Sequence, residues 1–293
     1  MAELAFTKYE GLGNDFLVVD VESADALGPA EAQLLCDRHR GVGGDGVLLV
    51  APASSPGASA RMVVLNADGS RPEMCGNGIR CVALHLARRD AVREGTIRVD
   101  TDAGLLACSV TTDDFLGATV GVDMGRGVAV GRYLGEFRGE KVEFAQVSMG
   151  NPHAIVFGRR YSLADIDAFG AQVNAAVPGG TNVEFAQLLG AQSIDLVVFE
   201  RGVGRTMACG TGACATAVAA ALAGQSPYDA PIEVRLPGGP LEIQVTRADL
   251  AVHMRGPARL VFSGTVSEGF LSRAVGQPSP LGSSLLGSSQ GER

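Results

Sequence analysis

The sequence is poor in lysine. Of its 24 basic Lys and Arg residues, only Lys8 and Lys141 are lysines. Pyridoxal-phosphate enzymes hold their cofactor through a Schiff-base lysine, and neither of these two lysines stands in a promising context for that role. The sequence therefore disfavours pyridoxal chemistry.

Long apolar runs and basic charge are also missing. No stretch of about 18 apolar residues occurs, so we expect no membrane span. The N-terminus lacks a basic region followed by an apolar one, so we expect no signal peptide and a cytoplasmic protein. The net charge of -8 gives no sign of the basic surface that a nucleic-acid-binding protein requires. With 46% hydrophobic and 19% charged residues, the 293-residue chain suits a globular protein of roughly two domains.

Six cysteines are present, namely Cys36, Cys75, Cys81, Cys108, Cys209 and Cys214. Structural disulfides are rare in a reducing cytosol. The pairs Cys75/Cys81 and Cys209/Cys214 are separated by five and four residues, unlike the usual zinc-knuckle spacing, so we expect no metal. A redox or metal-binding protein remains the alternative from another functional class.

The chain contains two similar halves. VVLNADGSRPEMCGNG (Val63–Gly78) aligns without gaps with VVFERGVGRTMACGTG (Val197–Gly212), which places Cys75 on Cys209. Four further pairs of segments match in the same order: Gly13–Val19 with Gly150–Val156, Gly43–Val47 with Gly179–Val183, Thr96–Leu106 with Pro231–Leu241, and Val122–Gly127 with Val252–Pro257. The shared order indicates a duplication.

Each half has the same expected layout. Short β-rich segments precede a helix that follows the cysteine, at about 78–90 and 212–224, and further strands come after it. The second helix is almost entirely small and apolar, so strands should surround it. We expect an α+β fold of two pseudo-symmetric domains, each a curled, mostly antiparallel sheet around a central helix. The N-terminal repeat domain would span 1–130 and the C-terminal one 131–270. A Gly-, Ser- and Pro-rich tail, 271–293, is expected to be disordered.

The repeated cysteines suggest a chemistry. A Cys ahead of a helix lies beside unpaired backbone N–H groups and the positive end of the helix dipole, an environment expected to lower the pKa of the thiol. The same N–H groups can hold a carboxylate. Two such turns facing each other would place a thiolate and a thiol on opposite faces of one carbon. That arrangement suits removal of a proton from an amino-acid Cα and its return on the other face.

The motifs resemble those of the diaminopimelate epimerase family. They are GNDF from Gly13, NADGS and MCGNGIRC within Asn66–Cys81, GNPH from Gly150, TNVEF from Thr181 and ERGVGRTMACGTGACA from Glu200. The resemblance covers roughly residues 5–265. It implies a cofactor-independent isomerase that interconverts LL- and meso-diaminopimelate, on the route to lysine and peptidoglycan. It also implies an active site between the halves and a homodimer.

The resemblance further implies roles for individual residues. Cys75 and Cys209 would be the acid/base thiols, assisted by His153 and Glu200. The substrate-binding residues would be Asn14, Asn66, Gly76, Asn77, Asn151, Asn182, Glu200, Arg201, Gly210 and Thr211. Arg201 supplies a fork for a carboxylate. Two positions depart from the family pattern: Arg205 stands where an acidic residue is common, and Gly46 where some members have Gln.

Rival enzymes share the fold. Proline racemases and hydroxyproline epimerases resemble the chain in having two cysteines, but they have a His at the position of Asn77 and a different second motif. Phenazine-biosynthesis-like isomerases lack the cysteine pair. Cys81 and Cys214 lie at apolar helical positions and are interpreted, like Cys36 and Cys108, as packing residues.

Overall fold

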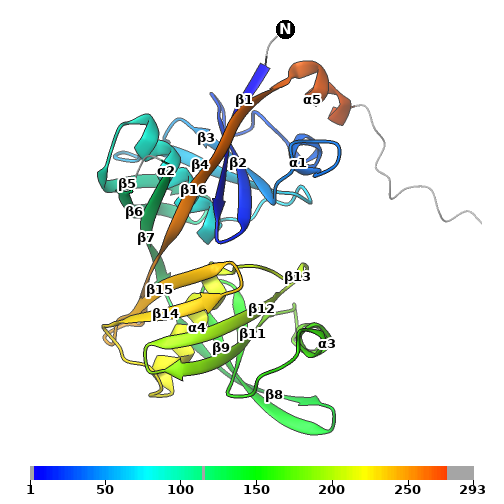
Figure 1. Cartoon of the computed structure of the whole chain (residues 1–293), viewed down its shortest axis with the longest axis vertical. Helices are drawn as coiled ribbons and strands as arrows, with labels where there is room; N and C mark the ends of the chain where they lie inside the picture. Colours follow the sequence, from blue (N-terminus) through cyan, green and yellow to red (C-terminus); the bar gives the residue numbers. More distant parts are fainter. Residues whose placement is uncertain (1–2, 114–115, 276–293) are drawn as a thin grey trace, which may run out of the picture.

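The protein is built from two lobes stacked end to end (Figure 1). The structure, a computed structural model, describes residues 3–113 and 116–275. The first lobe contains β1 (Glu3–Gly11), β2 (Asn14–Asp20), α1 (Pro29–Cys36), β3 (Gly46–Ala51), β4 (Ala60–Asn66), α2 (Gly76–Arg89), β5 (Glu94–Thr101), β6 (Gly104–Thr112) and β7 (Gly117–Arg126). The second contains β8 (Val128–Phe137), β9 (Glu140–Ser148), β10 (Pro152–Phe157), α3 (Leu163–Ala176), β11 (Asn182–Gly190), β12 (Ser193–Glu200), β13 (Gly204–Arg205), α4 (Gly210–Leu222), β14 (Pro231–Leu236) and β15 (Gly239–Val245). The chain ends with β16 (Ala251–Ser267) and α5 (Glu268–Val275).

The first lobe, called the N-lobe below, is a closed barrel around α2. Strands β1 to β7 follow one another across the sheet, and β16 pairs with both β7 and β1 to close it. Helix α2 contacts all eight strands. Its apolar residues, among them Ile79, Val82 and Leu86, are fully buried. The barrel therefore derives its core from one helix inserted along its axis.

The second lobe, called the C-lobe, curls in a similar way around α4, although among the described residues no strand pair closes its sheet. The parallel pairs β2/β3 and β4/β5 of the N-lobe have counterparts in β10/β11 and β12/β14, and the other pairings are antiparallel. Helix α4 is rich in alanine, and nearly all of its residues are buried. These features confirm the expected α+β fold of two pseudo-symmetric units, each a curled sheet around a central helix.

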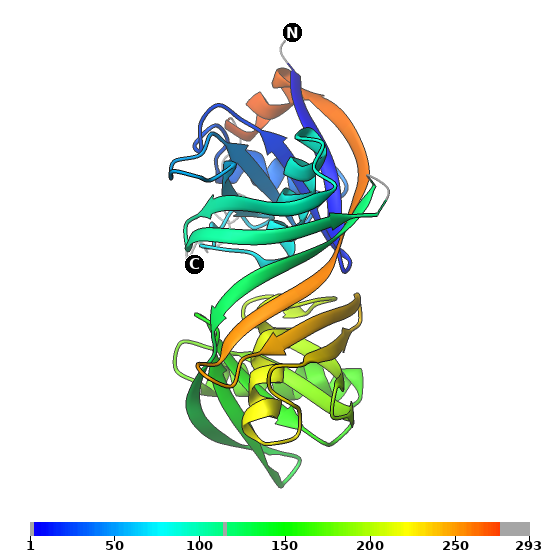
Figure 2. The same cartoon turned by 90° about the vertical axis from the view of Figure 1, so that its left-hand side faces the viewer.

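Two extended strands join the lobes. Strand β16 pairs with β15 in the C-lobe near its start and with β1 in the N-lobe near its end (Figure 2). In the opposite direction, β7 leaves the N-lobe and continues, after Gly127, into β8 of the C-lobe. Strand β16 therefore contributes to the sheets of both lobes. The expected boundary at residue 130 falls inside β8, and residues 259–267 pair with β1 of the N-lobe.

The remaining helices cover the outside of the barrels. Helices α1 and α5 contact each other on the N-lobe, and α3 packs against β11 and β12 of the C-lobe. Of the expected tail, residues 271–275 belong to α5, and 276–293 lie outside the described residues. Within 3–113 and 116–275, no helix combines the length and apolarity required to cross a membrane.

The lobes also touch through two turns. The turn between β1 and β2 meets the turn between β14 and β15, and Leu12 adopts a left-handed φ of 58° there. A Cβ built on Gly238 would lie 1.8 Å from the backbone oxygen of Leu12. Gly238 also donates its N–H to the carbonyl of Met207. This position has no room for any side chain.

We predict that Gly238→Ala lowers the free energy of unfolding by about 1–3 kcal/mol, because two backbone turns must separate to admit the methyl group. Thermal unfolding followed by circular dichroism measures the effect. Gly190→Ala is the control, since a Cβ there would meet nothing within 4 Å. Equal losses of Tm in both variants would contradict the contact between the turns.

Candidate active site

The two repeated cysteines begin two helices that face each other. Cys75 is the N-cap of α2 and Cys209 the N-cap of α4, with similar extended backbone angles of φ -134°, ψ 114° and φ -128°, ψ 107°. A Cβ built on Gly76 would lie 3.8 Å from the Cα of Gly210, and the reverse holds as well. The first turns of the two central helices are therefore in direct contact between the lobes.

Two methionines pack beside this contact. A Cβ on Gly76 would lie 3.4 Å from Cε of Met124, and one on Gly210 would lie 3.2 Å from Sδ of Met254. Met124 and Met254 are equivalent in the sequence repeat and lie on β7 and β16, the strands that join the lobes. A Cβ on Gly76 would meet these atoms at ordinary van der Waals distances, whereas one on Gly210 would require Sδ of Met254 to shift by a few tenths of an ångström.

Asn77 links the N-lobe cysteine turn to both lobes. Its Nδ2 donates to Oδ1 of Asn14 at 3.1 Å and to the carbonyl of Ala208, beside Cys209, at 3.3 Å. Its Oδ1 accepts from Nη2 of Arg80. The Arg80 guanidinium is fully buried and also donates to the carbonyls of Gly76 and Pro257. Burial lowers the pKa of Arg80.

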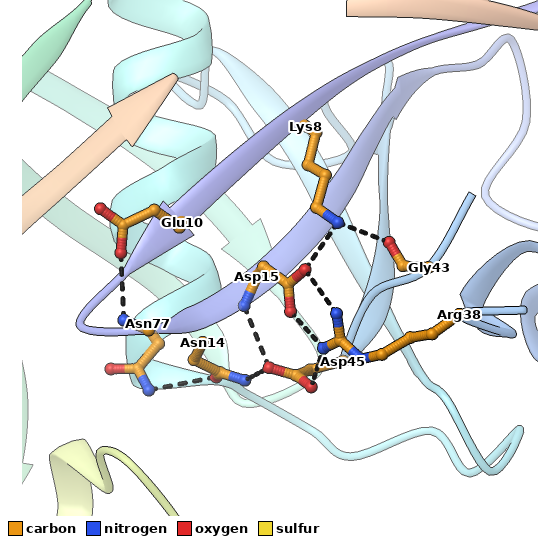
Figure 3. Close-up of polar contacts among 9 residues, drawn as sticks. Lys8, Glu10, Asn14, Asp15, Arg38, Gly43, Asp45 and Asn77 are labelled. Carbon is orange, nitrogen blue, oxygen red and sulfur yellow. Dashed lines mark hydrogen bonds and ion pairs between the residues drawn. The ribbon is translucent and has the colours of Figure 1, made fainter. Parts of the chain in front are cut away.

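The side-chain amide of Asn14 is hydrogen-bonded to a network of charged residues (Figure 3). Its Nδ2 donates to Oδ2 of Asp45, and Asp45 in turn pairs with Arg38. Arg38 and Lys8 both pair with Asp15. Burial acts to raise the pKa of Asp15, but hydrogen bonds from Arg38 and Lys8 bring it down to about 2. The network fixes the orientation of the Asn14 amide.

A second chain of polar contacts starts at Cys209. Its Sγ lies 3.5 Å from Oγ1 of Thr211, which accepts from Nδ2 of Asn151 at 3.4 Å. Oδ1 of Asn151 lies 2.9 Å from Nε2 of His153, and Nδ1 of His153 lies 2.6 Å from Oε1 of Glu184. The side chains of His153 and Glu184 are both completely buried. The structure thus brings together three of the predicted site residues with Cys209.

Glu200 also lies near Cys209. It is the last residue of β12 and accepts a hydrogen bond from Oγ1 of Thr206. Desolvation raises the pKa of Glu200, against hydrogen bonds from Thr206 and Cys209 that lower it. A carboxyl group with a raised pKa can form a hydrogen bond with a neighbouring thiol, here that of Cys209.

The expectation that the helix starts lower the thiol pKa is wrong in its net direction. Burial raises the pKa of Cys75, and the backbone N–H groups of Gly78 and Asn77 offset this only in part. For Cys209, burial and the nearby Glu200 and Glu184 carboxylates raise the pKa well above that of a free thiol. Desolvation therefore exceeds the stabilisation that the helix start provides.

The other predicted binding residues make local contacts. Asn66, at the end of β4, donates to Ser70 in the turn that follows. Asn182 donates to the carbonyl of Pro152 and accepts from the backbone N–H of Arg201. The Arg201 side chain is exposed and donates to the carbonyl of Gly179. Asn182 and Arg201 are thus brought together, whereas Asn66 lies at the end of β4 in the other lobe.

The two departures from the family pattern have structural reasons. Arg205 is exposed, and Asp167 of α3 pairs with its charge at the surface. Gly46 is buried, and a Cβ there would lie 2.8 Å from the carbonyl oxygen of Leu65 on β4. A larger residue at position 46 would therefore require β3 and β4 to shift.

Sequence reasoning missed three residues near the site, namely Arg80, Asp45 and Glu184. Glu184 could have been found by extending the repeat by one position, which aligns it with Leu48, or by noting an acidic residue in the apolar run NVEFA.

The cysteines assigned to packing, Cys36, Cys81, Cys108 and Cys214, are all buried. Three surface cavities of about 430, 570 and 360 Å³ are lined by none of the predicted site residues. In the described part of the chain, no group of three or more His, Cys, Asp or Glu side chains is arranged to hold a metal.

We predict that His153→Phe, which copies Phe16 of the N-lobe repeat, lowers the free energy of unfolding at pH 7 by about 3–5 kcal/mol, because it strands a buried carboxylate. Burial raises the pKa of Glu184, so the folded state holds the proton more tightly than the unfolded chain. The variant should therefore lose stability as pH rises above the unfolded Glu value of about 4.3.

Thermal unfolding between pH 4 and 7.5 measures this loss. The control is the double variant His153→Phe/Glu184→Leu, which reproduces the Phe16/Leu48 pair of the N-lobe and removes the buried charge. A single variant whose stability does not depend on pH more steeply than that of the unmodified protein would contradict the prediction.

Comparison with known proteins identifies the family. A family model described as diaminopimelate epimerase matches residues 6–130 and 145–261. A diaminopimelate epimerase of Desulforudis audaxviator is 44% identical, and the match covers 89% of this chain and 98% of the relative. A diaminopimelate epimerase 1 of Nostoc sp. is 41% identical, with 89% and 99% covered.

Solved structures agree on the fold. A probable proline racemase from Agrobacterium radiobacter has a TM-score of 0.72 at 16% identity, with 90% of this chain and 93% of that chain covered. A phenazine biosynthesis protein from Bacillus anthracis has a TM-score of 0.66 at 16% identity, with 91% and 100% covered. The sequence matches are much stronger and extend across both lobes. The chain therefore belongs to the diaminopimelate epimerase family.

Proposed function

We propose that this protein converts LL-2,6-diaminopimelate to the meso isomer by a two-base reaction that needs no cofactor. The observation that carries the proposal is the contact between the first turns of α2 and α4, each of which begins with a cysteine. The family membership and the names of the relatives support the substrate. The site lies where the two lobes meet.

The helix starts would hold the carboxylate at the reacting carbon. The backbone N–H groups of Gly76–Asn77 and Gly210–Thr211 lie at the positive ends of two helices that converge on one place. Negative charge moves onto this carboxylate when the α-proton leaves. Fixed N–H groups and dipoles stabilise that charge without having to reorganise.

The thiols would exchange the proton. One cysteine, as thiolate, takes the proton from Cα on one face, and the other, as thiol, returns a proton to the opposite face. The thiolate becomes a thiol and the thiol a thiolate, so charge and protons balance. Burial makes each thiolate a stronger base than a free one, which suits a weakly acidic C–H bond.

The remaining polar residues would recognise the rest of the substrate. The unreactive end of diaminopimelate carries an ammonium and a carboxylate. Arg201 supplies a fork for the carboxylate, and Asn66, Asn182 and Glu200 supply acceptors for the ammonium. A site built to hydrogen-bond both groups rejects amino acids that lack them.

The cellular setting follows from the same proposal. The product would serve lysine and peptidoglycan precursor synthesis, and the enzyme would work in the cytoplasm as a homodimer. His153 and Glu200 would support the thiols rather than exchange the substrate proton themselves. Glu200 is positioned for this by its hydrogen bonds with Thr206 and Cys209.

The proposal predicts deuterium at Cα when the reduced protein is incubated with LL-diaminopimelate in deuterated water without added cofactor. Mass spectrometry and chiral chromatography measure exchange and the meso isomer. Cys75→Ala and Cys209→Ala should each lower epimerisation at least about 100-fold, since each removes an acid/base group. Cys108→Ala, which changes a buried cysteine on β6, is the matched control.

Other outcomes would redirect the proposal. Exchange on proline or hydroxyproline but not on diaminopimelate would keep the two-thiol reaction and overturn the substrate. Exchange on no amino acid would overturn the reaction, and a redox or metal role for the cysteines would then be tested by thiol titration and zinc analysis.

A further inference from the structure

A buried positive charge lies beside the N-lobe cysteine turn and has no equivalent in the C-lobe. Arg80, five residues after Cys75 on α2, is completely buried. Its repeat equivalent on α4 is Cys214, which is also buried. Burial raises the pKa of Cys214 to about 12, so this residue is neutral at pH 7. The fold therefore accepts a small neutral residue at this helical position, and a guanidinium is present in one lobe only.

The hydrogen bonds of the Arg80 guanidinium go to three neutral acceptors. Nη1 donates to the carbonyl of Gly76 at 2.9 Å, Nη2 to Oδ1 of Asn77 at 3.0 Å and Nε to the carbonyl of Pro257 at 3.2 Å. The donor and acceptor roles are fixed, because a guanidinium only donates and a carbonyl oxygen only accepts. These bonds satisfy the N–H groups of Arg80 but leave its positive charge unbalanced.

A buried cation without a counter-ion destabilises a fold, because it has lost its hydration. Burial lowers the pKa of Arg80, but an arginine in a protein keeps its proton at pH 7. Two strands leave room for this charge by having glycine beside it. A Cβ on Gly11 of β1 would lie 3.2 Å from Nη2, and one on Gly256 of β16 would lie 3.4 Å from Nε. A charge enclosed so closely requires an anion nearby to offset its cost.

One group near Arg80 is suited to be that anion. Four titratable groups act on Arg80 through their charge, namely Glu10, Cys75, Cys81 and Cys214. Burial raises the pKa of the last two to about 12, so both are neutral at pH 7. Glu10 of β1 has a cation of its own, since its carboxylate pairs with Arg259 at 3.4 Å. Cys75 remains, and Arg80 is bonded to the two residues that follow it.

We propose that Arg80 is a positioning residue for Cys75: its buried charge balances the Cys75 thiolate, so that Cys75 and not Cys209 is the ionised thiol of the substrate-free enzyme. The proposal rests on the acid/base role proposed for the two cysteines. The surroundings of Cys209 have the opposite sign, since the carboxylates of Glu200 and Glu184 act on it. The charge of Arg80 offsets part of the burial that disfavours a thiolate at Cys75.

The other groups that face Cys75 come from both lobes. Two backbone N–H groups at the start of α2 favour its thiolate, and one of them, that of Gly78, lies 3.3 Å from Sγ. From the C-lobe, Glu200 at the end of β12 opposes the thiolate by its charge, and α4 begins at the thiol of Cys209. Strands β7 and β16 place two uncharged side chains at the helix starts, Met124 and Met254. Arg80 thus supplies the full positive charge among these groups.

The first test compares the two thiols in the unmodified, substrate-free protein. Iodoacetamide alkylates thiolates, so the pH dependence of the initial alkylation rate gives a midpoint for each cysteine, read by peptide mass spectrometry. The midpoint of Cys75 should lie at least about one pH unit below that of Cys209. A Cys209 midpoint at or below that of Cys75 would overturn the proposal. This comparison requires no variant to fold.

The second test separates the charge of Arg80 from its hydrogen bonds. Arg80→Met and Arg80→Lys both lose the planar fork, but only the lysine retains a positive charge. The Cys75 midpoint should rise by at least about one pH unit in Arg80→Met and stay within about 0.3 of the unmodified value in Arg80→Lys. Arg89→Met, which changes an exposed arginine at the end of the same helix, is the control and should leave the midpoint unchanged. Circular dichroism shows whether each variant is folded.

Two outcomes would contradict a role for the charge. An equal rise in Arg80→Met and Arg80→Lys would show that Arg80 acts by holding Gly76 and Asn77 in place, and would overturn the proposal. An unchanged Cys75 midpoint in folded Arg80→Met would make Arg80 a packing residue and overturn it equally. None of these measurements uses substrate, so they can fail while diaminopimelate epimerisation is observed, and can succeed while it is not.

Discussion

The contact between the first turns of α2 and α4 is the constraint on which the rest of the structure depends. Two helix starts with positive ends repel each other unless an anion or strong packing holds them together. Here the packing comes from paired glycines, Met124 and Met254, and from β7 and β16, which pass from lobe to lobe. The distance between the two cysteine turns therefore depends on how the lobes pack against each other, and not on either helix alone.

Duplication supplied two similar cysteine turns, and later substitution made their surroundings different. Beside Cys75 lies the buried cation Arg80, whose repeat equivalent is Cys214. Near Cys209 lie the carboxyl groups of Glu200 and Glu184. A reaction that takes a proton on one face and returns it on the other needs one thiolate and one thiol at a time. In the two-base reaction proposed above, these unequal surroundings would favour one protonation state of the pair over the other.

The lobes are held by contacts of two kinds. Asn77, which bonds to Asn14 and to the carbonyl of Ala208, joins the cysteine turns directly. The turn around Leu12 and the turn at Gly238 meet through backbone atoms alone. Strand β16, which pairs with β15 in the C-lobe and with β7 and β1 in the N-lobe, and the direct chain connection from β7 to β8 tie the halves together. Separation of the lobes would therefore disturb hydrogen bonds at the site before it disturbed either barrel.

The sequence by itself determined the fold class, the duplication and the pair of cysteine turns, because these rest on local signals: periodicity, glycine-rich turns and repeated motifs. It did not reveal Glu184 or Arg80 as neighbours of the site, since each is an ordinary residue of its own strand or helix. It also gave the wrong direction for the thiol pKa values, because a helix start is local but desolvation depends on what the other lobe covers. Burial, the asymmetry of the two cysteines and the crossing of the lobes were decided only by tertiary structure, which brings together residues that are far apart in the chain.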